Sequence, residues 1–150
     1  MEEIILELSS VIERHISALR SLSAEEFNFK KSPTKWSKKE ILGHLVDSAQ
    51  NNIRRFIVAQ YEDTPKITYN QDSWVSLTGY QQYNLPDLIQ LWLLLNKHIC
   101  QILKNISPEA SQRQSETSEL HTIKWLADDY LRHLKHHLYQ ILDLAPVAYP

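Results

Sequence analysis

The segment DDYLRHLKHHLYQIL, residues 128–142, places three histidines within five positions. Imidazole side chains bind divalent metals and exchange protons near neutral pH, so this density of histidine could mark a metal site. At about 100° per residue along a helix, His133 and His137 lie on the apolar side, one turn apart, whereas His136 lies on the polar side. Two histidines at i and i+4 can bind one metal, but two half-buried histidines with hydrogen-bond partners are the commoner reading of this spacing. A third ligand is therefore required.

The other histidines of the chain are His15, His44, His98 and His121. His15 and His98 stand singly in helical segments, and His121 precedes a helix start, where exposure to solvent is the usual state. His44 is different because it lies at the margin of an apolar helical stripe. A polar row continues from it through Ser48, Asn51 and Arg55. Such a row is either solvated or lines a pocket.

Two residues near His44 are candidates for a catalytic role. Asp47, three positions later, could orient the imidazole or relay a proton, or it could be an exposed partner of a neighbouring cation. Asn51 could hydrogen-bond a metal-bound water or a substrate. Ser48 would then line the same pocket. These roles rest on helical phase alone.

The elements that would position these side chains are predicted to be four long helices. Apolar residues recur at spacings of three and four over about 1–22, 37–61, 86–105 and 122–144. Ser37 and Glu40 form a capping-box pattern at the second start, and Thr122 can cap the fourth helix. Two glycines in 150 residues also favour long helices with few tight turns. We expect one all-α domain over residues 1–150, a four-helix bundle.

Aromatic residues concentrate in a long connection between the second and third helices, residues 62–85, which shows no periodicity. Trp74 and Tyr80 could cover the metal and contact an apolar part of the substrate. They could equally cap the end of the bundle core, the commoner use of loop aromatics. Trp92 and Trp125 are expected to pack between helices, and Trp36 to staple the start of the second helix.

Composition excludes several functional classes. The net charge is −2 with no basic block, so no nucleic-acid partner is expected. The single Cys100 excludes an intramolecular disulfide framework and is expected to pack as a small apolar residue. The acidic start is unlike a secretory signal, and no apolar run is long enough to span a membrane. We expect a cytoplasmic protein.

Two segments resemble a known family. WSKKEILGHLVDSAQNNIRRF and DDYLRHLKHHLYQIL are closely similar to the corresponding helices of the DinB/YfiT-like superfamily. QDSWVSLTGYQ and LIQLWLLLNKHI resemble the intervening parts of one branch, so the resemblance covers about residues 36–142. The pairing of W-S-x-x-E-I-x-x-H with a distal H-x-x-x-H is fairly specific. It implies a four-helix bundle with a divalent metal, often zinc or nickel, bound by His44, His133 and His137, the set that helical phase also favours.

Two classes of function follow. A divalent metal on three neutral imidazoles could lower the pKa of a bound water for hydrolysis, or bind a small thiol as thiolate. The resemblance implies thiol-dependent transferases and isomerases that use bacillithiol, mycothiol or glutathione, and a possible homodimer. The first class is therefore a metal-dependent enzyme acting on a small molecule, either a hydrolase or a thiol-dependent transferase. The alternative is a non-catalytic bundle, a binding or stress-response module with a structural metal or none.

Overall fold

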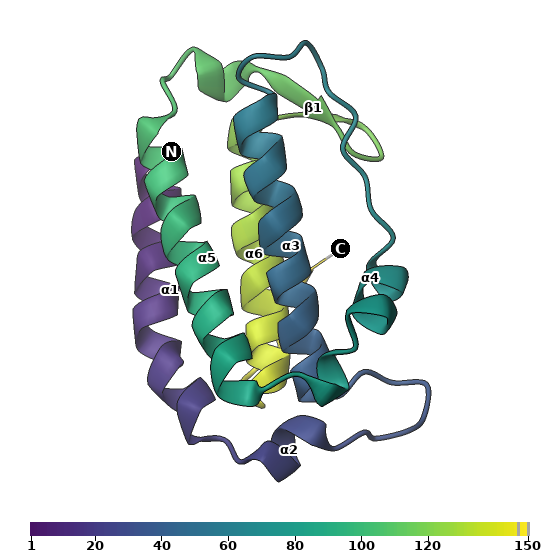
Figure 1. Ribbon diagram of the computed structural model, residues 1–150. Helices are drawn as coiled ribbons and strands as arrows, with labels where there is room; N and C mark the ends of the chain where they lie inside the picture. Colours follow the sequence, from purple (N-terminus) through teal and green to yellow (C-terminus); the bar gives the residue numbers. More distant parts are fainter. Residues whose placement is uncertain (147, 150) are drawn as a thin grey trace.

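Four long helices pack side by side along their length in the computed structural model, which describes residues 1–146, 148 and 149 (Figure 1). They are α1 (Glu2–Ser21), α3 (Lys38–Val58), α5 (Leu85–Asn105) and α6 (Ile123–Ile141). Both α3 and α1 contact α5 and α6. The helices α1 and α6 run in one direction, and α3 and α5 run in the other (Figure 1). The predicted four-helix bundle is confirmed.

The helix starts follow local capping signals. The hydroxyl of Ser37 accepts a hydrogen bond from the backbone N–H of Glu40 at 3.2 Å, and the Glu40 carboxylate accepts one from the Ser37 N–H at 2.8 Å. This confirms the predicted capping box of α3. The hydroxyl of Thr122 caps α6 in the same way, accepting from the N–H of Trp125 at 3.1 Å. The predicted ends were about three residues too long, since α3 ends at Val58 and α6 at Ile141.

The connection between α3 and α5 is long because these two helices run in the same direction. A helix of 21 residues is about 30 Å long, and the chain must travel back over that length before α5 can begin. The connection contains α4 (Gln71–Thr78) and the 3-10 helix η1 (Tyr80–Gln82), where no helix was predicted. The helix α4 has only about two turns, which is too short for apolar residues to recur at a recognisable helical spacing. The local sequence signals of α4 are the Asn70 side chain, which caps its start, and Gly79, which ends it at a φ of 69°.

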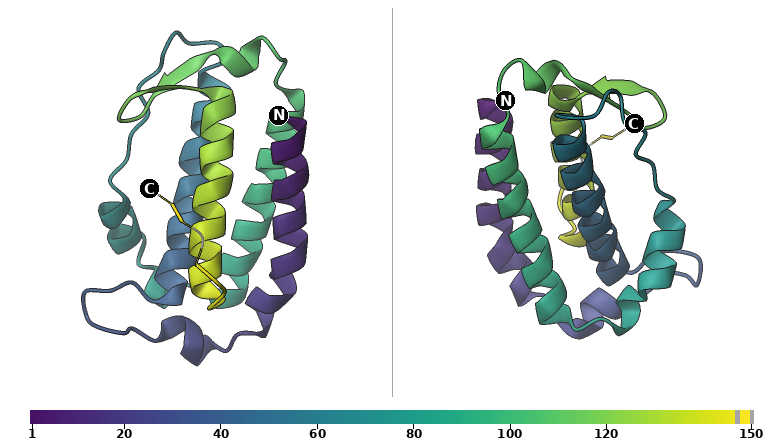
Figure 2. Two further views of the ribbon diagram at one scale, coloured as in Figure 1. Left: turned by 180° about the vertical axis from the view of Figure 1, so that it is seen from behind. Right: turned by 45° about the horizontal axis from the view of Figure 1, so that its top comes forward.

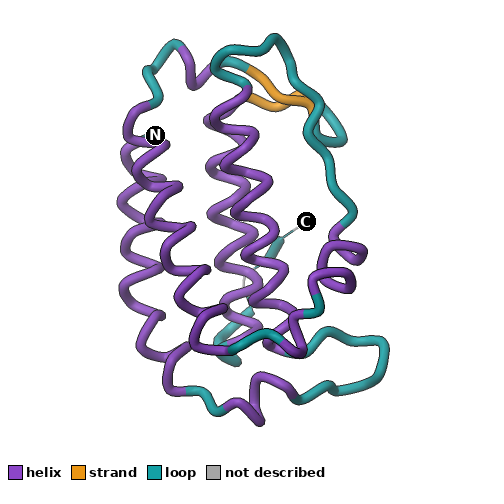
Figure 3. The backbone as a smooth tube through the Cα atoms, viewed as in Figure 1, coloured by secondary structure: helices purple, strands orange, loops and turns teal. Residues whose placement is uncertain are grey.

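Four further short elements, one α-helix, one 3-10 helix and two strands, were also missed. The helix α2 (Ala24–Asn28) lies between α1 and α3, and the polar segment before α6 contains η2 (Ala110–Gln112) and a two-stranded hairpin. Its strands β1 (Gln114–Glu116) and β2 (Leu120–Thr122) pair antiparallel at one end of the bundle (Figure 3). Glu116 exchanges backbone hydrogen bonds with Pro65 and Ile67. The hairpin therefore anchors the start of the long connection, which runs outside the bundle (Figure 2).

The core lies between the four long helices. Trp92 is fully buried there as predicted, and Cys100 is buried beside Ser9. The prediction for Trp125 was wrong, because its side chain is 41% exposed and stacks on His121 at a ring distance of 3.6 Å. Trp125 lies in the first turn of α6, off the stripe of residues that faces the core. Among the described residues, no helix combines the length and apolar character needed to cross a membrane.

Candidate metal centre

Three imidazoles meet where α3 lies against α6. One potential ligand nitrogen from each of His44, His133 and His137 lies within 4.8 Å of the other two. Nε2 of His44 is 3.0 Å from Nε2 of His133, and the three ring centroids are 4.6–4.9 Å apart. His44 comes from the second turn of α3, while the other two stand one turn apart on α6. His136 is outside this group.

Polar side chains orient two of these rings. Nδ1–H of His137 donates to Oε1 of Gln140 at 2.8 Å, which leaves Nε2 of His137 as the ring's lone-pair donor. The amide of Gln140 in turn donates to Nε2 of His136 at 2.9 Å. Nδ1 of His133 lies 3.4 Å from the Ser48 hydroxyl. Partners of this kind set the tautomer and direction of metal-binding histidines. Sequence reasoning missed Gln140, whose only signal is its position three residues after His137.

Burial keeps the three histidines neutral. Loss of solvent, followed by the repulsion of His137, lowers the pKa of His44 to about 4. Loss of solvent, followed by the repulsion of His44, lowers the pKa of His133 to about 2. The pKa of His137 is also lowered, mainly by burial. Neutral imidazole is the form that binds a metal, so all three rings are in the binding form at pH 7.

The donor set fits a divalent metal such as zinc or nickel. Three neutral nitrogen ligands with one remaining position are typical of catalytic zinc sites. Two nitrogens on a tetrahedral zinc lie about 3.3 Å apart, given Zn–N bonds of about 2.0–2.1 Å. The 3.0 Å between His44 and His133 is close to that spacing. All three ligand nitrogens lie within 4.8 Å of one another, so the rings would have to close part of that distance to share one ion.

Asp47 lies about one helical turn after His44 on α3. Its Oδ1 accepts a hydrogen bond from the hydroxyl of Tyr80 at 2.5 Å, and burial raises its pKa to about 6 despite that bond. Oδ2 of Asp47 and Nδ1 of His44 are both buried and have no hydrogen-bond partner among the described residues. These two unsatisfied atoms belong to residues one helical turn apart. The role of Asp47 in orienting His44 stays a prediction.

The other residues that the sequence analysis singled out differ in their burial and contacts. Asn51 is buried and donates its amide to the Asp47 carbonyl at 2.9 Å. Tyr80 is 2% exposed and packs beneath α3, while Trp74 is 36% exposed and contacts Tyr69. The ring of Trp36 lies 5.1 Å from the ring of His44, a contact that the predicted staple does not include. The helical pattern gave no indication of that contact.

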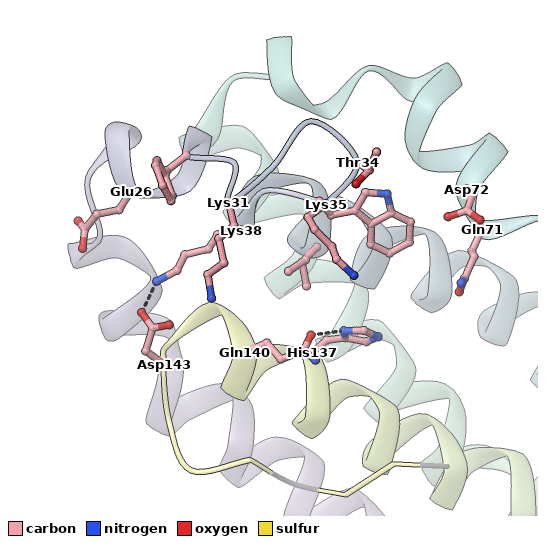
Figure 4. Close-up of a pocket in the computed structure, with 13 residues that line it drawn as sticks. Glu26, Lys31, Thr34, Lys35, Lys38, Gln71, Asp72, His137, Gln140 and Asp143 are labelled. Carbon is pink, nitrogen blue, oxygen red and sulfur yellow. Dashed lines mark hydrogen bonds and ion pairs between the residues drawn. The ribbon is translucent and has the colours of Figure 1, made fainter.

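His137 faces two cavities. The first, about 670 Å³, is walled by Trp36, Ile41 and three lysines, Lys31 and Lys35 of the loop before α3 and Lys38 at its start. Figure 4 shows Lys35 and His137 on facing sides of this cavity. The second, about 400 Å³, contains His133 and His137 together with polar residues of α3, namely Ser48, Asn52 and Arg55. Trp74, Tyr80 and Asn51 line neither cavity.

The fold is a four-helix bundle with a cluster of three histidines, and comparison with known proteins identifies its family. The model of the DinB superfamily matches residues 7–141, so the chain belongs to that superfamily. A protein of Oceanobacillus iheyensis named as a putative metal-dependent hydrolase is 33% identical over 73% of this chain and 64% of its own length. YfiT of Bacillus subtilis, also named as a putative metal-dependent hydrolase, is 25% identical over the same shares of this chain and of its own length. The chain thus spans just under two thirds of these relatives.

Solved structures show the same fold. YfiT of Bacillus subtilis, described as a probable metal-dependent hydrolase with an unusual four-helix bundle topology, superposes with a TM-score of 0.84 at 21% identity. That match covers 95% of this chain and 83% of YfiT. A mycothiol-dependent maleylpyruvate isomerase superposes with a TM-score of 0.72 at 16% identity, over 98% of this chain and 61% of the isomerase.

Proposed function

We propose that this protein is a metal-dependent enzyme in which His44, His133 and His137 hold a divalent metal, zinc or nickel. The observation that carries the proposal is the convergence of three neutral imidazoles, one buried and two half-buried, at a point that borders two cavities. A purely structural metal is normally enclosed by four protein ligands. Here the described residues supply three ligands, and His137 faces open space on two sides.

The metal, when bound, would act as a Lewis acid that makes water or a small thiol nucleophilic near neutral pH. The chain's own residues would hold the ligands in position and accept a proton. Burial holds the three imidazoles neutral, and Gln140 and Ser48 hold two of them in position. Asp47, with a pKa raised to about 6 and Oδ2 unpartnered, would accept a proton at that oxygen. Asn51 would have to release the Asp47 carbonyl before it could bind a substrate.

Hydrolysis is the first reaction to test, because the relatives in Oceanobacillus and Bacillus are named as putative metal-dependent hydrolases. Thiol transfer is the second, and one feature of the site favours it. Since His137 borders two separate cavities, a thiol and a second small molecule could approach the metal from different sides. The alternative, a non-catalytic binding module, requires no such access. Homodimer formation stays a prediction from the resemblance.

The test is metal analysis of protein purified without a histidine tag, followed by activity measurements. We expect about one zinc or nickel per chain, and turnover of an ester, an amide or a thiol–electrophile pair that chelation abolishes and metal restores. Protein that neither retains a metal nor binds zinc at micromolar concentration would refute the proposal. Stoichiometric metal without turnover in either screen would favour the non-catalytic module.

A further inference from the structure

Arg55 is a cation without an acidic partner in the wall of the second cavity. Its Nε and Nη2 donate to the backbone carbonyl of Ile67 at 3.1 and 3.0 Å, and Nη1 donates to Oδ1 of Asn52 at 3.4 Å. All of these acceptors are neutral. Among the described residues, no carboxylate oxygen forms an ion pair with Arg55, although seven other ion pairs are formed.

This arrangement has an energetic cost. A guanidinium remains protonated in proteins, so Arg55 keeps its charge even though burial lowers its pKa. A partly buried charge without a counter-ion is unfavourable unless a ligand supplies one. The acidic residue in the same cavity wall, Asp129, is already hydrogen-bonded by Tyr149 at 3.1 Å and by Arg132 at 3.4 Å. It acts on Arg55 only from beyond ion-pair distance.

The remaining hydrogen-bonding capacity of Arg55 suits an anion. A guanidinium has five N–H groups, and three hydrogen bonds to the protein leave two for a ligand. The backbone carbonyl of Ile67 holds one edge of the side chain in place, which limits its motion before a ligand binds. Planar, fixed guanidinium groups bind carboxylate and phosphate oxygens in pairs. The cavity, about 400 Å³, has the size of a small-molecule site.

We propose that Arg55 binds the anionic oxygen group, carboxylate or phosphate, of a small substrate that occupies this second cavity. The same cavity contains His133 and His137, so a molecule held at Arg55 by its anionic group would reach toward the three histidines with its other end. Ser48 and Asn52 line the space between as hydrogen-bonding groups. This inference rests on the proposed function and adds the class of substrate, an organic anion.

The experiment is calorimetric titration of zinc-loaded and metal-free protein with succinate, with inorganic phosphate, and with uncharged succinamide as the ligand control. We expect succinate or phosphate to bind and succinamide not to bind. Arg55→Gln should weaken anion binding at least tenfold while the zinc affinity, measured separately, stays unchanged. Arg54→Gln is the matched control, because Arg54 is the exposed neighbouring arginine and should have no effect. The anion that binds more tightly identifies the group as carboxylate or phosphate.

Arg55→Lys keeps the charge but loses the paired donors, so it should fall between the wild type and Arg55→Gln. It also provides a test if circular dichroism shows that Arg55→Gln does not fold. Absence of binding by both anions, or equal affinity in the wild type and the Arg55 variants, would overturn the proposal. Failure of the wild type to bind zinc would refute the metal site alone, because the titrations of metal-free protein still report on Arg55.

Discussion

At the scale of single residues, the candidate site depends on which ring nitrogen of each histidine is available. Gln140 accepts from Nδ1–H of His137, so Nε2 of that ring carries the lone pair. Nε2 of His44 and Nε2 of His133 already face one another at 3.0 Å. One of these two neutral rings therefore carries its hydrogen on Nε2 and donates a hydrogen bond to Nε2 of the other. A metal would replace that hydrogen bond with two coordinate bonds.

The first prediction separates the ligands from their neighbour. His44→Ala or His133→Ala should lower zinc affinity more than the roughly 10–100-fold typical of losing an outer partner, because a coordinate bond is lost. His136→Ala is the control on the same helix and should leave affinity within a few-fold. Competition with a chromophoric chelator would measure all three. An equal loss in His136→Ala would show that the ligand assignment is wrong.

The second prediction concerns Gln140. Gln140→Ala removes the acceptor of the His137 Nδ1–H, so zinc affinity should fall by about 10–100-fold. Gln140→Glu restores an acceptor that is stronger because it is charged, and should keep or raise the affinity. The same chelator competition applies. If alanine and glutamate give the same affinity, the hydrogen bond at His137 does not orient the ligand.

At the scale of elements, the long connection is packed directly onto the backbone of α3. A Cβ atom added at Gly43 would lie 2.2 Å from the ring of Tyr80, closer than any real contact allows. The hydroxyl of the same tyrosine donates to Asp47, one turn further along α3. Tyr80 therefore holds the connection against the helix that carries His44, and a glycine within that helix leaves the necessary space.

The third prediction tests this packing. Alanine is about 1 kcal/mol more favourable than glycine within a helix, yet Gly43→Ala should destabilise the protein by about 1–3 kcal/mol through the clash with Tyr80. Urea unfolding would measure the change in free energy. Gln50→Ala, at an exposed position of the same helix, should stay within about 0.5 kcal/mol of the wild type. A Gly43→Ala protein as stable as the wild type would mean that the connection is loosely attached.

At the scale of the whole molecule, the three histidines link two helices that are far apart in the sequence. His44 and His133 are 89 positions apart and meet because α3 packs along α6. The connections between the long helices cross the ends of the bundle or run outside it, so this meeting depends on tertiary packing. A metal held by both helices would stabilise the folded chain, because the unfolded chain does not bring the ligands together.

The fourth prediction follows from this linkage. Free zinc at about 100 times its dissociation constant should add about 2.7 kcal/mol to the free energy of unfolding. For a chain of 150 residues that corresponds to several degrees in Tm, measurable by calorimetry with zinc and with a chelator. His44→Ala should abolish the zinc-dependent increase. A metal-dependent increase that persists in this variant would place the stabilising ion elsewhere.

The sequence by itself determined the local features. Ser37 and Glu40 specify the start of α3, Thr122 specifies the start of α6, and the apolar spacings specify the four long helices, because caps and stripes depend on residues a few positions apart. Helical phase also placed His133 and His137 on one face of α6. With the family resemblance, it selected His44 from the four remaining histidines.

Only the tertiary structure decided how these parts meet. It brought the ring of Trp36 to His44 and the carboxylate of Asp47 to the hydroxyl of Tyr80. It also placed Arg55, without an acidic partner, in the wall of the cavity that the two histidines of α6 line. It also exposed Trp125, which we had expected to pack between helices. The physical reason is that burial, cavities and unpaired charges depend on contacts between helices, and periodicity along one helix does not specify which surface of another will face it.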